Sequence, residues 1–249
     1  MIELNNISKT FNTGKTNQVN ALTNINLEIN QGEFVVIIGS NGSGKTTLLN
    51  VVAGTIIPNT GTISIAGNDV TKLADYNRSK WVARIFQNPL LGTAAELSIV
   101  DNFRLAALRT QNKGLRIGKT EKFRNEVRDR IATLGMGLEN KIEQPIGTLS
   151  GGQRQALTLL MSVMDECKIL LLDEPTAALD PRSAEHVMRT ADDLVKQYKL
   201  TAILVTHNLK DVANYGSRII QMGEGEIIKD ISGVEKSNLK QTDMFEWFG

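Results

Sequence analysis

The stretch Gly39-Ser40-Asn41-Gly42-Ser43-Gly44-Lys45-Thr46 has the spacing G-x-x-x-x-G-K-[ST] of a phosphate-binding loop. It follows a short apolar run at 34–38 and precedes a helix-like segment at 47–53. Its glycines let backbone N–H groups curl around an anion, and the helix that follows adds the positive end of its dipole. A glycine-rich turn without a ligand is the alternative, but it leaves the Lys-Thr pair unexplained. The sequence therefore predicts a phosphate site.

Two side chains at the end of this loop indicate a nucleoside triphosphate with a metal ion. Lys45 is expected to reach the β- and γ-phosphates, and the Thr46 hydroxyl is expected to take one coordination position of Mg²⁺.

A pair of carboxylates follows a second apolar run. The run at 169–172 leads directly into Asp173 and Glu174. In an open α/β sheet such a buried strand delivers its last residues to the edge where ligands bind. We expect Asp173 to support Mg²⁺ and Glu174 to act as general base on the attacking water. The alternative, a pair of helix-capping acids before Pro175, explains neither the preceding strand nor the phosphate loop.

The remaining pattern predicts an α/β fold in one domain spanning 1–249. Residues 2–38 alternate like half-buried strands, and the continuous apolar runs at 169–172 and 202–205 suit parallel strands covered on both faces. Between about 90 and 160 the period becomes helical, with apolar residues at helix spacing among charged ones, which predicts a helical insertion.

The composition excludes several classes of function. The chain has 249 residues, with 28 basic and 27 acidic side chains and a net charge of +1, so no long-range field favours nucleic acid or an anionic membrane. No apolar run approaches the roughly 20 residues of a membrane helix. We expect a soluble cytosolic chain that reaches a membrane only through a partner.

The pentapeptide Leu149-Ser150-Gly151-Gly152-Gln153 opens another helix-like run. Ser150 is a suitable N-cap, but two glycines weaken a helix start unless something approaches the backbone closely. An anion at this helix start would explain both features.

Taken together, these motifs resemble the nucleotide-binding subunit of an ATP-binding cassette (ABC) transporter. The resemblance covers nearly the whole chain and rests on the joint order of residues 39–46, Gln87, residues 149–153, Asp173-Glu174, and Asp180 with His207. It implies a RecA-like P-loop core, an N-terminal antiparallel β subdomain and an α-helical subdomain inserted at about 90–160. It also implies a head-to-tail dimer that sandwiches two ATP molecules.

The family's residue roles carry over to matching positions. Gln87 matches the glutamine that touches Mg²⁺ and the attacking water and senses the membrane subunit, and His207 matches the histidine that holds the γ-phosphate. Glu174, His207 and Gln87 are thus the implied catalytic residues, and Thr46, Gln87 and Asp173 the implied metal residues. The implied nucleotide contacts of one subunit are Gly39, Ser40, Asn41, Gly42, Ser43, Gly44, Lys45, Thr46 and Thr47. Those of the other subunit are Ser150, Gly151, Gly152 and Gln153, together with Asp180 of the loop that crosses between subunits.

The resemblance also implies an adenine platform. The family usually stacks the base on an aromatic residue near the N-terminus, often tyrosine, and Phe11 occupies that place here, with Val19 as the apolar neighbour of the adenosine. Stacking needs only a π-face, so phenylalanine suffices. Ordinary core packing is the alternative for both residues. The loop residues Ala177 and Ala178 depart from the family, which more often has serine in the first half of that loop.

The resemblance implies partners as well as ligands. A separate membrane permease, contacted through a groove beside Gln87 and residues 88–100, and a solute-binding protein would complete an importer on the inner face of the cell membrane. The segments 85–87, 92–94 and 147–150 resemble subunits of amino-acid-type importers, in particular the branched-chain type. The transported solute leaves no mark on a motor subunit.

Two other functions compete with this one. A non-transport cassette ATPase, an ATP-gated clamp in DNA repair or translation, usually carries coiled-coil insertions or two fused cassettes, which this chain lacks. A small-molecule kinase leaves residues 149–153 unexplained. The aromatic tail at 239–248 is expected to dock as a terminal helix, with a partner-binding surface as the alternative.

Overall fold

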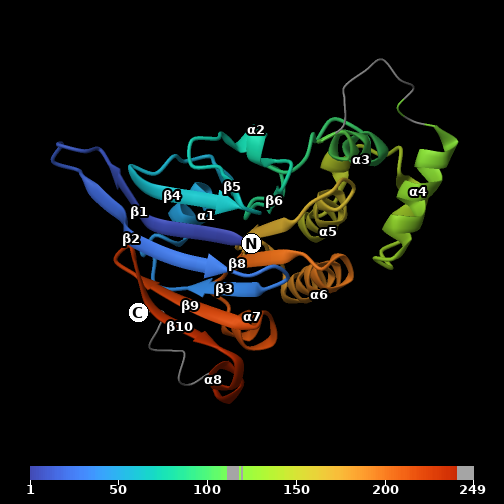
Figure 1. Cartoon of the computed structure of the whole chain (residues 1–249). Helices are drawn as coiled ribbons and strands as arrows, with labels where there is room; N and C mark the ends of the chain where they lie inside the picture. The colour runs from blue at the N-terminus through green and yellow to red at the C-terminus, as the bar shows by residue number, and fades with distance from the viewer. Residues whose placement is uncertain (111–117, 119, 240–249) are drawn as a thin grey trace.

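The computed structural model describes residues 1–110, 118 and 120–239, and the expectation for the C-terminal tail falls almost entirely outside them. Two sheets and a set of helices build the molecule (Figure 1). The strands are β1 (Ile2–Phe11), β2 (Val19–Ile29), β3 (Phe34–Ile38), β4 (Thr60–Ile65), β5 (Asn68–Asp69), β6 (Val82–Ile85), β7 (Ile169–Asp173), β8 (Thr201–Val205), β9 (Arg218–Gly223) and β10 (Glu226–Ser232). The α-helices are α1 (Lys45–Ala53), α2 (Asp75–Arg78), α3 (Ile99–Ala107), α4 (Glu121–Ala132), α5 (Gly151–Ser162), α6 (Pro181–Tyr198), α7 (Leu209–Asn214) and α8 (Gly233–Asn238), with short 3₁₀ turns at Glu139–Lys141 and Ile146–Thr148.

The larger sheet has the order β10-β9-β3-β8-β7-β6, in which β9, β3, β8, β7 and β6 are parallel and β10 is an antiparallel edge. All residues of β3, β7 and β8 are buried, as expected for strands covered on both faces. Parallel strands bring their carboxyl ends to one edge, so the loops after β3, β7 and β8 lie together there. The predicted α/β core is thus confirmed.

The smaller sheet is antiparallel, with the order β2-β1-β4-β5. Its apolar residues, including Ile2 and Ile63, share one core with α1 and with one face of the larger sheet, to which Val35 and Ile37 belong. The alternate residues of β3, Val36 and Ile38, face a second core that contains the helices. The alternation of side chains along β3 therefore divides the interior into two layers.

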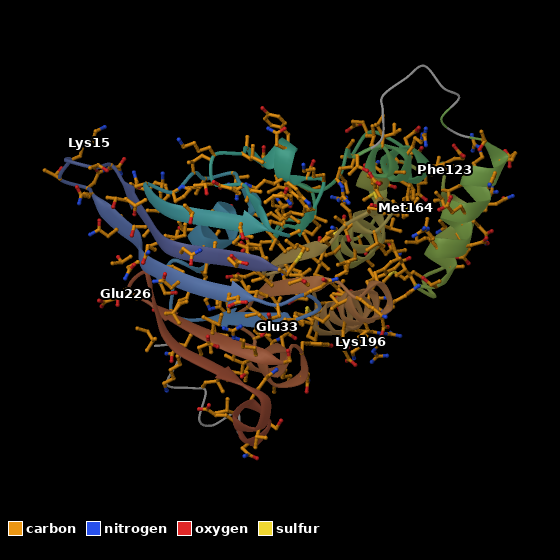
Figure 2. The ribbon with its side chains drawn as sticks, in the orientation of Figure 1. Lys15, Glu33, Phe123, Met164, Lys196 and Glu226 are labelled. Carbon is orange, nitrogen blue, oxygen red and sulfur yellow. The ribbon has the colours of Figure 1, made fainter. Side chains whose placement is uncertain are left out.

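The helices α3, α4 and α5 gather at one end of the molecule, away from the β1–β2 hairpin, whose tip carries Lys15 (Figures 1 and 2). Phe123 of α4 lies on the side that faces α3 (Figure 2), and its ring packs under the Arg104 guanidinium at 5.5 Å. The predicted amphipathic helix buries Val127 and Ile131. These helices occupy the stretch expected of the helical insertion.

Candidate nucleotide site

The phosphate loop joins β3 to α1 in a backbone that requires glycine. Gly39 has φ 144°, and a Cβ there would lie 2.1 Å from the Met222 carbonyl oxygen. Gly44 has φ 100°, and its Cβ would lie 2.5 Å from the Ala21 carbonyl oxygen. Both contacts are too short for any side chain, so β2 and β9 close around the loop only because these two residues are glycines.

The start of α1 is suited to an anion. No side chain caps it, and its first turn contains no acidic residue, so its first N–H groups are available for an anionic ligand. Lys45 is buried, and its ammonium donates to the carbonyl oxygens of Gly39 and Ser40 at 2.7 and 2.8 Å. Burial lowers the pKa of Lys45, while Glu174 and Asp173 act in the opposite direction. A bound phosphate group would add negative charge beside this ammonium and favour its charged form.

Three predicted catalytic residues meet in space. Glu174 follows β7, and its carboxylate lies 2.9 Å from His207 Nε2, while Gln87 Nε2 donates to its other oxygen at 3.4 Å. Glu174 also has φ 45°, an uncommon conformation for a residue with a side chain, and its N–H donates to the Val205 carbonyl at 2.9 Å. The backbone of Glu174 is therefore strained but fixed by a hydrogen bond, and it directs the carboxylate toward the edge of the sheet where ligands bind.

The three predicted metal residues offer oxygen atoms, which Mg²⁺ prefers. Thr46 is exposed at the start of α1, Asp173 ends β7, and Gln87 lies beside Glu174. Within the described residues no group of three or more His, Cys, Asp or Glu side chains could hold a metal ion. A small set of this kind fits Mg²⁺ that is bound mainly through substrate phosphates and water.

Arg84 and Gln155 were missed at the sequence level. Arg84 donates to Asp173 at 2.6 Å, and Gln155 donates to the carbonyls of Phe86 and Pro175 at 2.9 and 3.0 Å. Gln155 thereby fixes the main chain just before Gln87 and just after Glu174. The sequence did contain a signal for both, because each is a polar residue inside an otherwise apolar strand or helix. A buried polar side chain needs a hydrogen-bond partner.

The second predicted nucleotide-binding segment begins α5. The Ser150 hydroxyl accepts from the Gln153 N–H at 3.3 Å, and the Gln153 side chain accepts from the Ser150 N–H at 3.2 Å, which forms a capping box. The expectation that its glycines make room for an anion now has a competing explanation. A Cβ on Gly152 would lie 2.7 Å from the Ser183 side chain, and one on Gly151 3.2 Å from Leu179.

No hydrogen bond within the described residues joins this segment to the phosphate loop of the same chain. Asp180 caps α6 by accepting from the N–H groups of Arg182 and Ser183 at 3.1 Å. The Ser183 side chain, followed by the Ser183 N–H, is the main reason why the pKa of Asp180 lies below its usual value.

Phe11 and Val19 are direct partners across β1 and β2. Val19 is 53% exposed, which argues against ordinary core packing for this residue. It lies two residues before Ala21, whose carbonyl borders the phosphate loop at Gly44. The Lys9 ammonium lies 5.4 Å from the centre of the Phe11 ring. The structure thus places both predicted adenine contacts on the strand pair that borders the loop.

Fold and site together define a P-loop ATPase of the cassette type, and comparisons with known proteins agree. Residues 22–177 match the family model described as ABC transporter. The chain is 38% identical over 253 residues to a tyrosine transport ATP-binding protein of Clostridioides difficile, with 100% of this chain and 98% of that protein covered. It is 34% identical to the energy-coupling factor transporter ATP-binding protein EcfA2 of Acetivibrio thermocellus, with 100% and 85% covered.

Solved structures agree on the fold. A dimeric post-hydrolysis state of the ATP-binding cassette MJ0796 with ADP and Pi superposes with a TM-score of 0.79 at 29% identity, covering 93% of this chain and 98% of that one. The cbiO1 structure from Clostridium perfringens, part of the complex cbiONQ, gives a TM-score of 0.74 at 26% identity, covering 93% and 88%.

The chain belongs to the ATP-binding subunits of ABC transporters. It is an ATP-binding and ATP-hydrolysing subunit of a family whose cassettes dimerise and partner with membrane components. No helix among the described residues is long and apolar enough to cross a membrane. Nothing in the comparisons favours an ATP-gated clamp.

Proposed function

We propose that this chain binds ATP with Mg²⁺ between two copies of itself, and that hydrolysis at Glu174 reopens the dimer and drives import through a separate permease. The observation that carries the proposal is the placement of Glu174 between His207 and Gln87, at the sheet edge that also holds the phosphate loop. In this site His207 and Gln87 hold the Glu174 carboxylate so that it can accept a proton from water.

The remaining residues bind the nucleotide and orient it. Lys45 and the N–H groups at the start of α1 face the phosphates, with Thr46, Asp173 and Gln87 as the oxygen donors toward Mg²⁺. Mg²⁺ held there would neutralise charge on the phosphates. Within the described residues no hydrogen bond joins Ser150 and its neighbours to this loop in one chain, and a second copy would bring them to the same nucleotide. Phe11 supplies the face on which adenine stacks.

A groove beside Gln87 is the proposed docking site for the permease. It has a volume of about 820 Å³ and lies between α2, the segment after Gln87, and helices α3 and α5. Tyr76, Leu91 and Leu105 line it and are 74%, 66% and 55% exposed. Exposed apolar side chains around a concave surface are typical of a protein-binding site. A cytoplasmic helix of the permease would cover them and hold this subunit at the inner face of the membrane.

The tyrosine transport and energy-coupling factor relatives support an importer of a small solute, and the first also supports the amino-acid type. The expected solute-binding protein stays a prediction, because no feature of this chain bears on it.

The test is the variant Glu174→Gln. We expect it to bind ATP with Mg²⁺, to lose at least about 100-fold in turnover, and to elute as an ATP-dependent dimer, because the general base is lost while the phosphate contacts remain. Dimer formation is measured by light scattering after size exclusion, and turnover by phosphate release. Glu235→Gln, at an exposed position of α8, is the control. Hydrolysis by Glu174→Gln at the parental rate would contradict the proposal.

A further inference from the structure

Arg84 of β6 joins the groove to the nucleotide site. Its Nη2 donates to Asp173 Oδ2 at 2.6 Å, and the two side chains are only 13% and 11% exposed. The same residue lines the groove together with Phe86, and its guanidinium lies 4.8 Å from the centre of that ring. A short charge-assisted hydrogen bond between two nearly buried groups holds the carboxylate in one orientation.

The other arm of the guanidinium reaches α1. Nη1 donates to Asn50 Oδ1 at 2.5 Å. That amide oxygen also accepts from the Thr55 hydroxyl at 3.1 Å, so its own position is fixed. Asn50 follows Thr46 by four residues in α1 and therefore lies on the same face of the helix. One side chain thus connects the helix that carries Thr46 to the strand that carries Asp173.

We propose that Arg84 is a positioning residue that sets the Asp173 carboxylate relative to Thr46, so that both can serve one divalent cation beside the nucleotide. The proposal rests on the proposed Mg²⁺ role of those two residues. Arg84 bonds Oδ2 of Asp173, and no hydrogen bond within the described residues reaches Oδ1, the oxygen left toward the cation. Arginine suits this position because its planar fork reaches two acceptors at once, whereas lysine offers a single point charge.

The alternative roles of Arg84 predict different results. If Arg84 competed with the cation for Asp173, its removal would tighten cation binding. If it only neutralised a buried charge, Arg84→Lys would restore binding fully. A positioning role predicts weaker cation binding without Arg84, and only partial rescue by lysine.

The experiment measures Mn²⁺ binding by electron paramagnetic resonance in the Glu174→Gln background with ATP, so that no hydrolysis intervenes. We expect Arg84→Met to weaken Mn²⁺ about 10-fold or more, as for other outer-shell partners of metal ligands. Arg84→Lys should be intermediate, and Asn50→Ala should shift the affinity less but in the same direction. ATP binding in excess chelator should change by less than about twofold in each variant, since Arg84 acts through the cation site.

Arg218→Met is the matched control, because Arg218 also joins two elements through Glu33 and Asp230 at 16% exposure, but lies away from the site. It should leave Mn²⁺ affinity unchanged. An Mn²⁺ affinity that is unchanged or higher in the Arg84 variants, while the Glu174→Gln background protein binds Mn²⁺ normally, would overturn the role proposed for Arg84. The proposed function would not be affected by that result. If Arg84→Met fails to fold, the Mn²⁺ affinities of Arg84→Lys and Asn50→Ala test the proposal by the same criterion. A background protein that binds no Mn²⁺ with ATP would overturn the proposed function as well.

Discussion

At the scale of single residues, the site depends on groups whose environments differ from those of surface residues. Glu174 has a backbone conformation that few glutamates adopt, Lys45 is buried among carbonyl oxygens, and Asp173 is bonded by an arginine. The strained backbone of Glu174 and the burial of the Lys45 charge are unfavourable in isolation and persist because the surrounding structure enforces them. Perturbed groups that lie together in this way are typical of a functional site.

Asp211 of α7 makes stability dependent on pH. It is buried, and burial raises its pKa from the ordinary 3.8 to about 6, although the Thr206 hydroxyl acts in the opposite direction. Because the folded state binds the proton more tightly than the unfolded state, this residue's contribution to stability falls as pH rises from about 4 through 6 and stays low above that.

The variant Asp211→Asn removes this dependence. We expect its melting temperature to match the parent at pH 4 and to exceed it by a few degrees at pH 8, measured by differential scanning calorimetry. Asp192→Asn, at a half-buried position of α6 in an ion pair with Lys196, is the control and should show no gain at pH 8. Equal melting temperatures of parent and Asp211→Asn at both pH values would contradict the burial effect.

At the scale of elements, α1 needs support at both ends. Its start is adapted to an anion, whereas its end is held by Arg78 of α2, which is fully buried. Arg78 donates to the carbonyl oxygens of Val51 and Val52 at 2.7 and 3.0 Å, as well as to those of Leu73 and Thr71. A cation at a helix C-terminus also opposes the negative end of the dipole. Burial lowers the pKa of Arg78 to about 10, so it remains charged at neutral pH.

Replacing Arg78 with methionine leaves these buried carbonyls without donors. We expect Arg78→Met to lower the free energy of unfolding by about 3 kcal/mol, measured by urea denaturation with circular dichroism. Arg189→Met, which breaks only an exposed ion pair with Glu185 in α6, should cost less than about 1 kcal/mol. Similar losses in the two variants would mean that Arg78 does not support α1.

At the scale of the whole molecule, the proposed nucleotide contacts come from two segments that no hydrogen bond joins within the described residues. One is the phosphate loop with its carboxylates, and the other is the exposed start of α5. The capping box at Ser150 shows that this helix start is complete within one chain. The nucleotide contact proposed for this segment requires a second copy of the chain.

Ser150→Arg tests that division. We expect the variant to bind ATP as a monomer within about threefold of the parent, while ATP-induced dimerisation is lost, because a bulky cation occupies the proposed contact. Binding is measured with a fluorescent ATP analogue and dimerisation by light scattering in the Glu174→Gln background. Ser150→Ala, which loses the same cap at a cost of about 1 kcal/mol but adds no bulk, should still dimerise. A normal ATP-induced dimer of Ser150→Arg would argue against the sandwich.

The groove makes a second prediction at this scale. Leu91→Asp places a charge among the exposed apolar residues of the groove and should reduce co-purification with the permease at least about tenfold, measured by quantitative pull-down from detergent extracts. Ile228→Asp, at 54% exposure on β10 outside the groove, is the control. ATP hydrolysis by the isolated subunit should be unchanged in both. Equal retention of the permease by the two variants would place the docking site elsewhere.

The sequence alone determined the core strands, the phosphate loop and the order of the motifs. These depend on local spacing: a parallel strand buried on both faces is a nearly continuous apolar run, and the phosphate loop is marked by glycines at fixed spacing before Lys45. Only the tertiary structure decided which side chains touch. Nothing in the linear order indicates that Arg84 reaches Asp173, 89 positions away, or that Arg78 ends α1. Ser183 likewise lies against Gly152 through packing of α5 on α6. Such contacts depend on how the layers pack, and packing is a property of the folded chain.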